Sequence, residues 1–235
     1  MSEIPKKELI CPPPFISPPL PKVFLVLGKP LELWPYIDIH GRLLFFVAYF
    51  PAYGRKVKRI CVSLFRKING RLQWYAGGSP PSYQLYNQPK FQASFHETTF
   101  VIVRRESQVK LIESLFPNVI GTTWPPGIRK LDVQPLKHRN VLIWPGVSLH
   151  ECAAAQILSG KLWDLGVGHT ILNSLEILPE GWELGNPLPD GLSYRELFKK
   201  LDHCPSIRFF EQANARYPML RHLVASLGYR DEEYL

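Results

Sequence analysis

The sequence lacks the long apolar runs and the paired cysteines that mark membrane-spanning and disulfide-rich proteins. No stretch of its 235 residues approaches the roughly 18 consecutive apolar residues that a membrane span needs. The first seven residues lead into prolines and lack the continuous apolar core of a secretory signal. Its cysteines are Cys11, Cys61, Cys152 and Cys204, without Cys-x-x-Cys spacing. We therefore expect no membrane segment, disulfide framework or zinc cage and, by default, a cytoplasmic location.

The first half of the chain changes pattern at about residue 23. Residues 1–22 are rich in proline, which favours extended, polyproline-like backbone, so we expect a tail. Residues 23–97 hold short apolar runs, such as 23–27, separated by turn residues. Among the turns is Asn69-Gly70, the strongest short hairpin signal. This pattern predicts a basic domain rich in antiparallel β-strands.

The second half alternates strand and helix patterns before ending in helices. Strands are expected at 98–103, 118–124, 141–144 and 170–178, and helices at 106–115 and 149–165. Such alternation over 98–188 implies a mainly parallel sheet flanked by helices, with ligands at the carboxyl ends of strands. Residues 189–235 should form C-terminal helices, because Ser193 and Glu196 make a capping box and 219–227 is amphipathic. The predicted fold class is α+β with an α/β core.

Positive charge is concentrated in the first part of the chain. The net charge is +8, and residues 1–100 carry 13 Lys and Arg against 5 Asp and Glu, whereas 101–235 carry 15 of each. The excess peaks in a basic cluster that contains no acid. Its members are Arg55, Lys56, Lys58, Arg59, Arg66, Lys67 and Arg71.

A cluster of this density suits the neutralisation of phosphates, and nearby aromatic rings could stack on bases. These aromatic residues are Tyr49, Tyr53, Phe65, Trp74 and Tyr75. Two plainer explanations stay open. The cations could keep a sheet edge from aggregating, and the rings could fill the core of a small sheet.

Short motifs run in one register between Leu33 and Leu201. They are Trp34-Pro-Tyr36-Ile-Asp38-Ile-His-Gly41, Pro81-Ser-Tyr-Gln-Leu85-Tyr86, Val103-Arg-Arg-Glu-Ser107, Leu115-Phe-Pro117, Thr122-Thr-Trp-Pro-Pro-Gly127, Trp144-Pro-Gly-Val-Ser148 and Leu178-Pro-Glu-Gly-Trp-Glu-Leu-Gly-Asn186. Together they resemble the DNA primases of phages, plasmids and other mobile elements, whose core is the Toprim domain shared with topoisomerases and bacterial primases. The resemblance implies a primase-like domain at 23–97 and a Toprim-like domain at 98–188.

The resemblance also implies a magnesium site whose ligands this sequence has lost. In the family, one glutamate and two aspartates at strand ends hold Mg²⁺ for a phosphodiester reaction. The matching positions here are Arg104, Gly146 and Ser148. The second glutamate of the first motif is kept as Glu106, and Glu183 replaces a later aspartate. The resemblance therefore implies a degenerate Toprim protein with no catalytic residues, no bound Mg²⁺ and none of the family's activity.

Three functions are compatible with these features. The first is a catalytically inactive accessory factor of replication or of a mobile element, which binds nucleic acid, above all single-stranded DNA, through the basic cluster and through Arg104 and Arg105. The second is a protein-interaction module that binds a replisome, helicase or inhibitor partner. The third is an active enzyme in which Glu106, Glu151 and Glu183 form a relocated metal site. For Arg104, an internal ion pair with a residual acid such as Glu106 or Glu183 is as well supported as phosphate binding.

Overall fold

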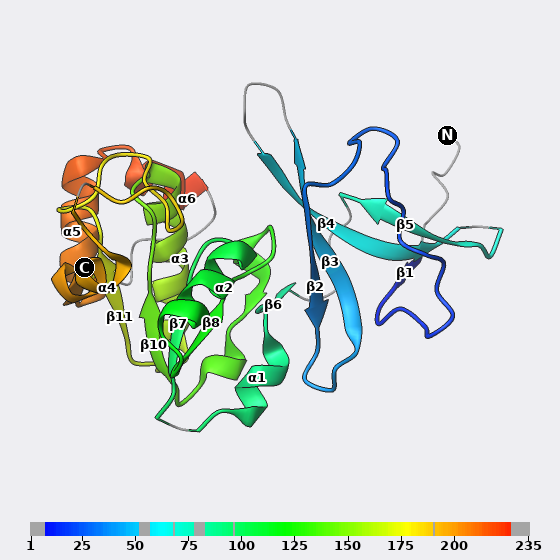
Figure 1. The fold of residues 1–235 in the computed structure, drawn as a ribbon, viewed down its shortest axis with the longest axis horizontal. Coiled ribbons are helices and arrows are strands. Elements are labelled where there is room, and N and C mark those ends of the chain that lie inside the picture. The colour runs from blue at the N-terminus through cyan, green and yellow to red at the C-terminus, as the bar shows by residue number, and fades with distance from the viewer. Residues whose placement is uncertain are drawn as a thin grey trace. The chain divides into compact units, whose positions relative to one another are not determined.

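The computed structural model describes residues 8–51, 57–67, 69–77, 83–95, 97–189 and 191–226. The chain divides into two compact units, both drawn in Figure 1. The first unit comprises Met1–Gln92 with Pro125–Gly127, and the second comprises Ala93–Trp124 with Ile128–Leu235. The predicted mixture of an antiparallel and a mainly parallel sheet is confirmed.

The first unit is built on a five-stranded antiparallel sheet. Its strands are β1 (Glu8–Ile10), β2 (Glu32–Ile37), β3 (Leu43–Pro51), β4 (Val57–Arg66) and β5 (Leu72–Ala76). The long strand β4 is central, because it pairs with β3, β1 and β5. The expected hairpin joins β4 to β5, where Lys67 N–H donates to Arg71 O at 2.8 Å. The short elements β6 (Tyr83–Gln84) and α1 (Gln88–Ala93) follow.

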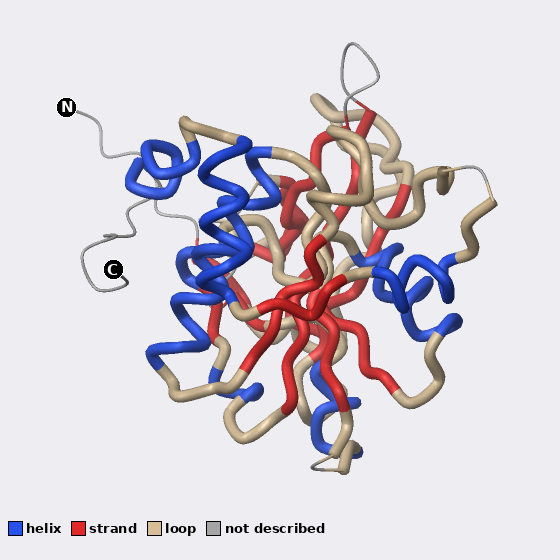
Figure 2. The backbone as a smooth tube through the Cα atoms, turned by 90° about the vertical axis from the view of Figure 1, so that its left-hand side faces the viewer, coloured by secondary structure: helices blue, strands red, loops and turns tan. Residues whose placement is uncertain are grey.

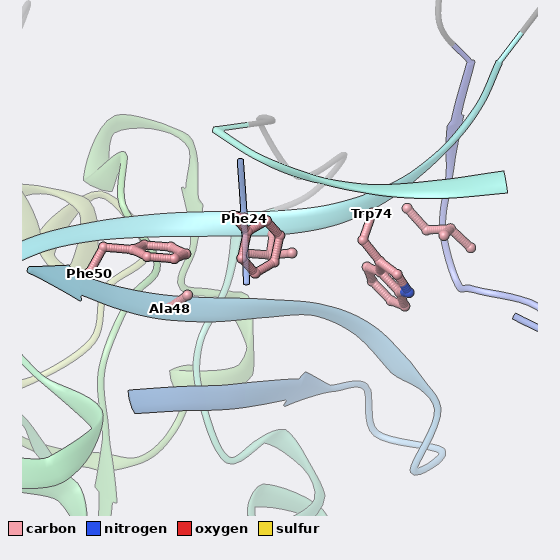
Figure 3. Packing of buried hydrophobic residues seen from close by; sticks show 6 residues of the cluster. Phe24, Ala48, Phe50 and Trp74 are labelled. Atoms are coloured by element: carbon pink, nitrogen blue, oxygen red, sulfur yellow. The ribbon is translucent and has the colours of Figure 1, made fainter. Parts of the chain in front are cut away.

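The proline-rich segment differs from the expected tail wherever it is described. Strand β1 pairs with β4, and the indole Nε1 of Trp74 donates to Pro18 O at 2.8 Å. The expected strand at 23–27 is instead a turn closed by Phe24 and Gly28, and Phe24 lies edge-on to Phe50 at 5.4 Å between ring centroids. Figure 3 shows this packing. The segment folds because its few apolar side chains cover one face of the sheet.

The first primase-like motif is a structural turn after β2. Both oxygens of Asp38 are engaged: Oδ1 accepts from His40 N and Arg42 N, each at 2.9 Å, and Oδ2 accepts from Arg42 Nε at 2.7 Å. Gly41 closes the turn with φ of +78°, a conformation that favours glycine. Burial alone would raise the pKa of Asp38, but these hydrogen bonds lower it. The motif therefore fixes the β2–β3 connection.

The second unit contains the mainly parallel sheet. Its strands are β7 (Thr99–Ile102), β8 (Val119–Thr122), β10 (Asn140–Ile143), β11 (His169–Asn173) and β12 (Asp202–Cys204). They lie in the order β12-β11-β10-β7-β8, with only the edge strand β12 antiparallel to its neighbour among these pairings. The strand expected at 170–178 ends early, because Asn173 and Ser174 begin a turn.

Helices cover both faces of this sheet. They are α2 (Glu106–Leu115), α3 (Leu149–Asp164), α4 (Tyr194–Lys200), α5 (Ser206–Arg216) and α6 (Leu220–Ser226). Strand β9 (Leu131–Asp132) and the 3₁₀ helices η2 (Ile128–Lys130) and η3 (Gln134–Leu136) lie between β8 and β10. Right-handed crossovers place α2 and α3 on opposite faces, and α5 and α6 pack against α3. Figure 2 shows helices on both sides of the strands. The sequence did not predict α1, β1 or β12, and it predicted α5 only as part of the helices over 189–235.

Candidate functional site

The connections between the parallel strands run in opposite directions on the two sides of the β7–β10 pair. Strand β7 continues through α2 to β8 on one side, whereas β10 continues through α3 to β11 on the other. In open parallel sheets, ligands bind at such a switch point, outside the carboxyl ends of the strands. The segments that leave these two ends carry Arg104, Arg105, Gly146 and Ser148. The structure thus brings the four positions to the edge where the sequence predicted them.

Arg104 reaches from the end of β7 to helix α3. Its Nε lies 3.1 Å from Oε1 of Glu151, and its guanidinium carbon lies 5.6 Å from the ring centroid of Trp124. The Glu151 side chain is only 6% exposed, whereas that of Arg104 is 36% exposed. Burial raises the pKa of Glu151, an effect that Arg104 opposes and Glu183 increases. The positive charge of Arg104 therefore offsets part of the cost of burying the Glu151 carboxylate.

Gly146 lies where no side chain fits. A Cβ atom built on it would stand 2.9 Å from the carbonyl oxygen of Trp182, 3.2 Å from Cγ of Glu151 and 3.3 Å from Cγ of Glu183. The Trp182 carbonyl is held in place, since it accepts from Val147 N at 2.8 Å. The space that an aspartate would need here is therefore taken by backbone.

Arg105 secures the loop that follows β11. Its guanidinium nitrogen lies 2.9 Å and 3.2 Å from the two carboxylate oxygens of Glu183. Gln108 completes the attachment: its Oε1 accepts from the backbone N–H groups of Arg104 and Arg105, each at 3.0 Å, and its Nε2 donates to Leu184 O at 3.0 Å. Sequence reasoning missed Gln108, although a Gln at the third position of a helix is a known capping signal.

The remaining predicted positions begin helices. Ser148 caps α3, and its hydroxyl accepts from Glu151 N at 3.3 Å. Glu106 is the first residue of α2 and is fully buried. A carboxylate at a helix N-terminus is stabilised by the helix dipole. Ser148 thus has a structural use that does not involve a metal.

An internal ion pair of Arg104 is present. Its partner is Glu151, which the sequence did not suggest for this pair, and Glu183 pairs with Arg105. Each of the two arginines at this site is therefore paired with a carboxylate. Phosphate binding by Arg104 and Arg105 stays a prediction.

The residues at this edge do not fit the Mg²⁺ ion that the Toprim resemblance implies. Magnesium requires oxygen ligands in near-octahedral geometry. Glu151 and Glu183 are each engaged by an arginine, and the Gly146 position has no room for a side chain. In the described ranges, no group of three or more His, Cys, Asp or Glu side chains is arranged to hold a metal ion.

The basic cluster of the first unit is divided between two faces of its sheet. Side chains alternate along a strand, so Lys58 and Arg66 share a face with buried Val62 and Leu64, whereas Arg59 points to the opposite face. Arg66 lies 3.4 Å from Glu8. Arg55 and Lys56 lie outside the described residues. The cluster therefore does not form a single surface.

The described cations that share the face of Arg59 have different surroundings. Arg59 donates to the Tyr36 hydroxyl at 3.4 Å and lies over the ring of Tyr49 at 5.9 Å. Lys67 and Arg71 oppose each other across the β4–β5 hairpin, two residues beyond the Phe65–Gln73 pair. Arg59 thus belongs to an aromatic cluster, and Lys67 and Arg71 lie at the end of the hairpin.

Comparisons with known proteins give a fold but no family. No family model and no curated protein matches the sequence. A DNA primase domain from Pseudomonas aeruginosa has a similar structure, with a TM-score of 0.53 and 13% identity over 83% of this chain and 61% of that one. The chain thus spans less than two thirds of that domain. The fold is that of primase catalytic domains.

Two further primase structures are less similar to this chain. The E. coli primase catalytic core gives a TM-score of 0.45 at 12% identity, over 86% of this chain and 71% of that one. The zinc-binding and RNA polymerase domains of the Aquifex aeolicus primase give a TM-score of 0.48 at 12% identity, over 82% of this chain and 47% of that one.

Each helix in the described part of the chain is too short or too polar to cross a membrane.

Proposed function

We propose that this chain is a nucleic-acid-binding protein that keeps the Toprim-type primase fold but works without Mg²⁺ and without catalysis. In this proposal residues 23–97 form the basic binding domain and residues 98–188 a degenerate Toprim-like domain. The chain acts as an accessory factor in the replication of a cell or mobile element, with single-stranded DNA as its main partner and a helicase as a further one. Its compartment is the cytoplasm.

The pairing of Arg104 with Glu151 is the observation that carries the proposal. A fixed guanidinium, 3.1 Å from a carboxylate oxygen, occupies the edge of the sheet where the family places its metal ligands. An arginine repels a divalent cation and satisfies the carboxylate that remains. The closed space at Gly146 supports the same conclusion.

Fluorescence anisotropy with labelled single- and double-stranded DNA and RNA tests the binding. The titrations are run across a salt series, with and without Mg²⁺. We expect affinity to fall steeply as salt rises, because phosphate contacts release counterions, and to be unchanged by Mg²⁺. Absence of binding to every nucleic acid at low salt would rule the function out.

A primer-synthesis and nicking assay tests the absence of catalysis. With template, nucleotides and Mg²⁺ or Mn²⁺ present, we expect no product from the purified protein. A metal-dependent product that disappears in Glu151→Gln and Glu183→Gln variants would instead support the relocated metal site.

Exposed apolar side chains in and just after the proline-rich segment favour a second candidate, a protein-interaction module. Phe15 and Leu25 are fully exposed, and Ile16 and Val26 are 88% and 95% exposed. Exposed groups of large apolar side chains often mark interaction surfaces. If this candidate is right, Phe15→Ser with Leu25→Ser should abolish salt-insensitive binding to a replication partner such as a helicase and leave DNA binding unchanged.

A further inference from the structure

The β4–β5 hairpin carries a strip of side chains on one face of the sheet, which we name the hairpin face. The register Phe65↔Gln73 and Ser63↔Tyr75 places Phe65, Gln73 and Tyr75 on the same side. The backbone bond from Lys67 to Arg71 continues this register by one pair. Because side chains alternate, Lys67 and Arg71 follow Phe65 and Gln73 on that side. The hairpin face consists of Phe65, Lys67, Arg71, Gln73 and Tyr75.

Phe65 and Tyr75 are the stacking candidates that remain accessible. Of the five aromatic residues that the sequence suggested, Tyr49 and Trp74 are each only 5% exposed, and Tyr53 lies outside the described residues. Phe65 and Tyr75 are half-buried, and their rings meet edge to face with centroids 5.6 Å apart. A pair of rings held in this way offers a preformed apolar platform at little cost in side-chain entropy.

The opposite face of the same hairpin packs into the hydrophobic core of the first unit. Leu64 and Trp74 belong to the buried cluster beneath the proline-rich segment. Figure 3 shows Trp74 within this cluster. Within the described residues, the accessible aromatic rings of the hairpin therefore lie on the Phe65–Tyr75 side.

Charge on the hairpin face complements a nucleic-acid backbone. No Asp or Glu occurs between residues 57 and 77. Lys67 follows Phe65 by two strand residues, about 6.6 Å, and Arg71 lies four residues before Tyr75, about twice as far, whereas Arg66 on the other face is already opposite Glu8. Gln73 adds an amide between rings and cations, 3.4 Å from the Tyr75 hydroxyl. The strip thus combines the π-faces and the adjacent cations that single-strand binding uses.

We propose that the hairpin face is a base-stacking site for single-stranded nucleic acid, in which unpaired bases stack on Phe65 and Tyr75 while Lys67 and Arg71 hold the neighbouring phosphates. The inference rests on the proposed nucleic-acid function and specifies its site and its substrate. A duplex keeps its bases stacked inside the helix, so it gains the phosphate contacts alone. The site therefore discriminates single strands from duplexes.

The test compares two variants in the full-length protein, with labelled single-stranded DNA, single-stranded RNA and duplex DNA as probes. Phe65→Leu with Tyr75→Leu keeps apolar volume but removes the π-faces. We expect its affinity for single strands to fall about fivefold or more, the lower end of the effect of losing a stacked base, and its duplex affinity to stay unchanged. Trp163→Leu, which replaces an exposed aromatic residue of α3, is the control that should change neither.

A charge-matched comparison tests the phosphate contacts. Lys67→Glu with Arg71→Glu and Lys58→Glu with Arg66→Glu change the net charge equally but on opposite faces. We expect the first pair to weaken single-strand binding at least tenfold more than the second and to reduce the salt dependence. Unfolding temperatures within the wild-type range establish that the variants are folded.

The outcomes separate this inference from the proposed function. If the wild type binds single strands in a salt-dependent manner and the leucine variant binds them equally well, the hairpin face is not a stacking site, and the proposed function is unaffected. Equal loss for the two glutamate pairs would likewise overturn the site. If the wild type binds no nucleic acid, the proposed function fails and the inference fails with it.

Discussion

The two units of this protein use positive charge in opposite ways. In the second unit, Arg104 and Arg105 each contact a carboxylate, at 3.1 Å and 2.9 Å. In the first unit, the hairpin cations Lys67 and Arg71 belong to a stretch of chain without a single acid. Paired guanidinium groups stabilise the fold, whereas cations that face solvent can bind external anions. The comparison agrees with our proposal that binding lies in the β-rich unit and that the arginines at the carboxyl edge of the parallel sheet are structural.

The paired charges also explain how carboxylates can be held close together at this edge of the sheet. Carboxylates brought together at strand ends repel one another and lose hydration. Arg104 and Arg105 relieve both costs from within the chain. The loop around Trp182, joined to Val147 and to Gln108, is held by the same arrangement.

Removing the paired guanidinium should have the largest effect. Arg104→Met leaves Glu151 buried beside Glu183 without its nearest cation. We expect the free energy of unfolding to fall by about 3 kcal/mol, the low end for breaking a buried pair, because Arg104 is partly exposed. Denaturant unfolding measures the loss. Adding Glu151→Gln should recover most of it, and strictly additive losses would argue against a stabilising pair.

A methyl group at the closed position should cost less. Gly146→Ala forces Cβ against the Trp182 carbonyl, so we expect a loss of about 2 kcal/mol in unfolding free energy. Gly168→Ala is the matched control, because nothing lies within 4 Å of its added Cβ. Equal stability of the two variants would mean that the Trp182 loop can shift at little cost in free energy. In that case, an aspartate at 146 could be accommodated after all.

Acidification should destabilise the second unit through a histidine that is partly buried there. Burial lowers the pKa of His169, although its bond to Val167 O acts in the opposite direction, and its Nε2 lies 2.7 Å from Ser159 Oγ. The unfolded chain therefore binds a proton more readily than the folded one. Stability should be complete above the ordinary pKa of 6.5 and fall as the pH drops below it. Thermal unfolding across this range measures how stability depends on pH. The same pH dependence in a His169→Gln variant would mean that another group causes it.

Neutralising the hairpin cations should have the smallest effect on stability. Lys67→Met with Arg71→Met removes two charges that form no ion pair with another described residue, so we expect the unfolding free energy to change by less than about 0.5 kcal/mol. The same denaturant experiment measures it. A loss comparable to that of Arg104→Met would show that these cations support the fold, and the contrast between the two units would disappear.

Local patterns gave the reliable part of the sequence prediction. Helix α2 spans Glu106–Leu115, as its apolar spacing predicted, and the Ser193–Glu196 capping box is formed at the start of α4. The Asn69-Gly70 hairpin and the parallel strands β7, β8, β10 and β11 are also present. Each of these features depends on residues close together in the chain, so the sequence displays their causes directly.

The failures concern segments whose structure depends on distant contacts. The proline-rich segment resembles a tail by composition, yet Pro18 O accepts a hydrogen bond from Trp74, far along the chain. The end of the strand expected at 170–178 is a turn, because Ser174 Oγ donates to Pro145 O at 3.1 Å. Neither partner could be identified from spacing alone.

The sequence by itself determined the uneven charge, the order of the primase-like motifs and the absence of carboxylates at positions 104, 146 and 148. Only the tertiary structure decided which acids meet Arg104 and Arg105, that Gly146 has no space for a side chain, and which cations share a face with Phe65 and Tyr75. The physical reason is that ion pairing and steric exclusion act over a few ångströms in space. The folded sheet, and not the distance along the chain, sets those separations.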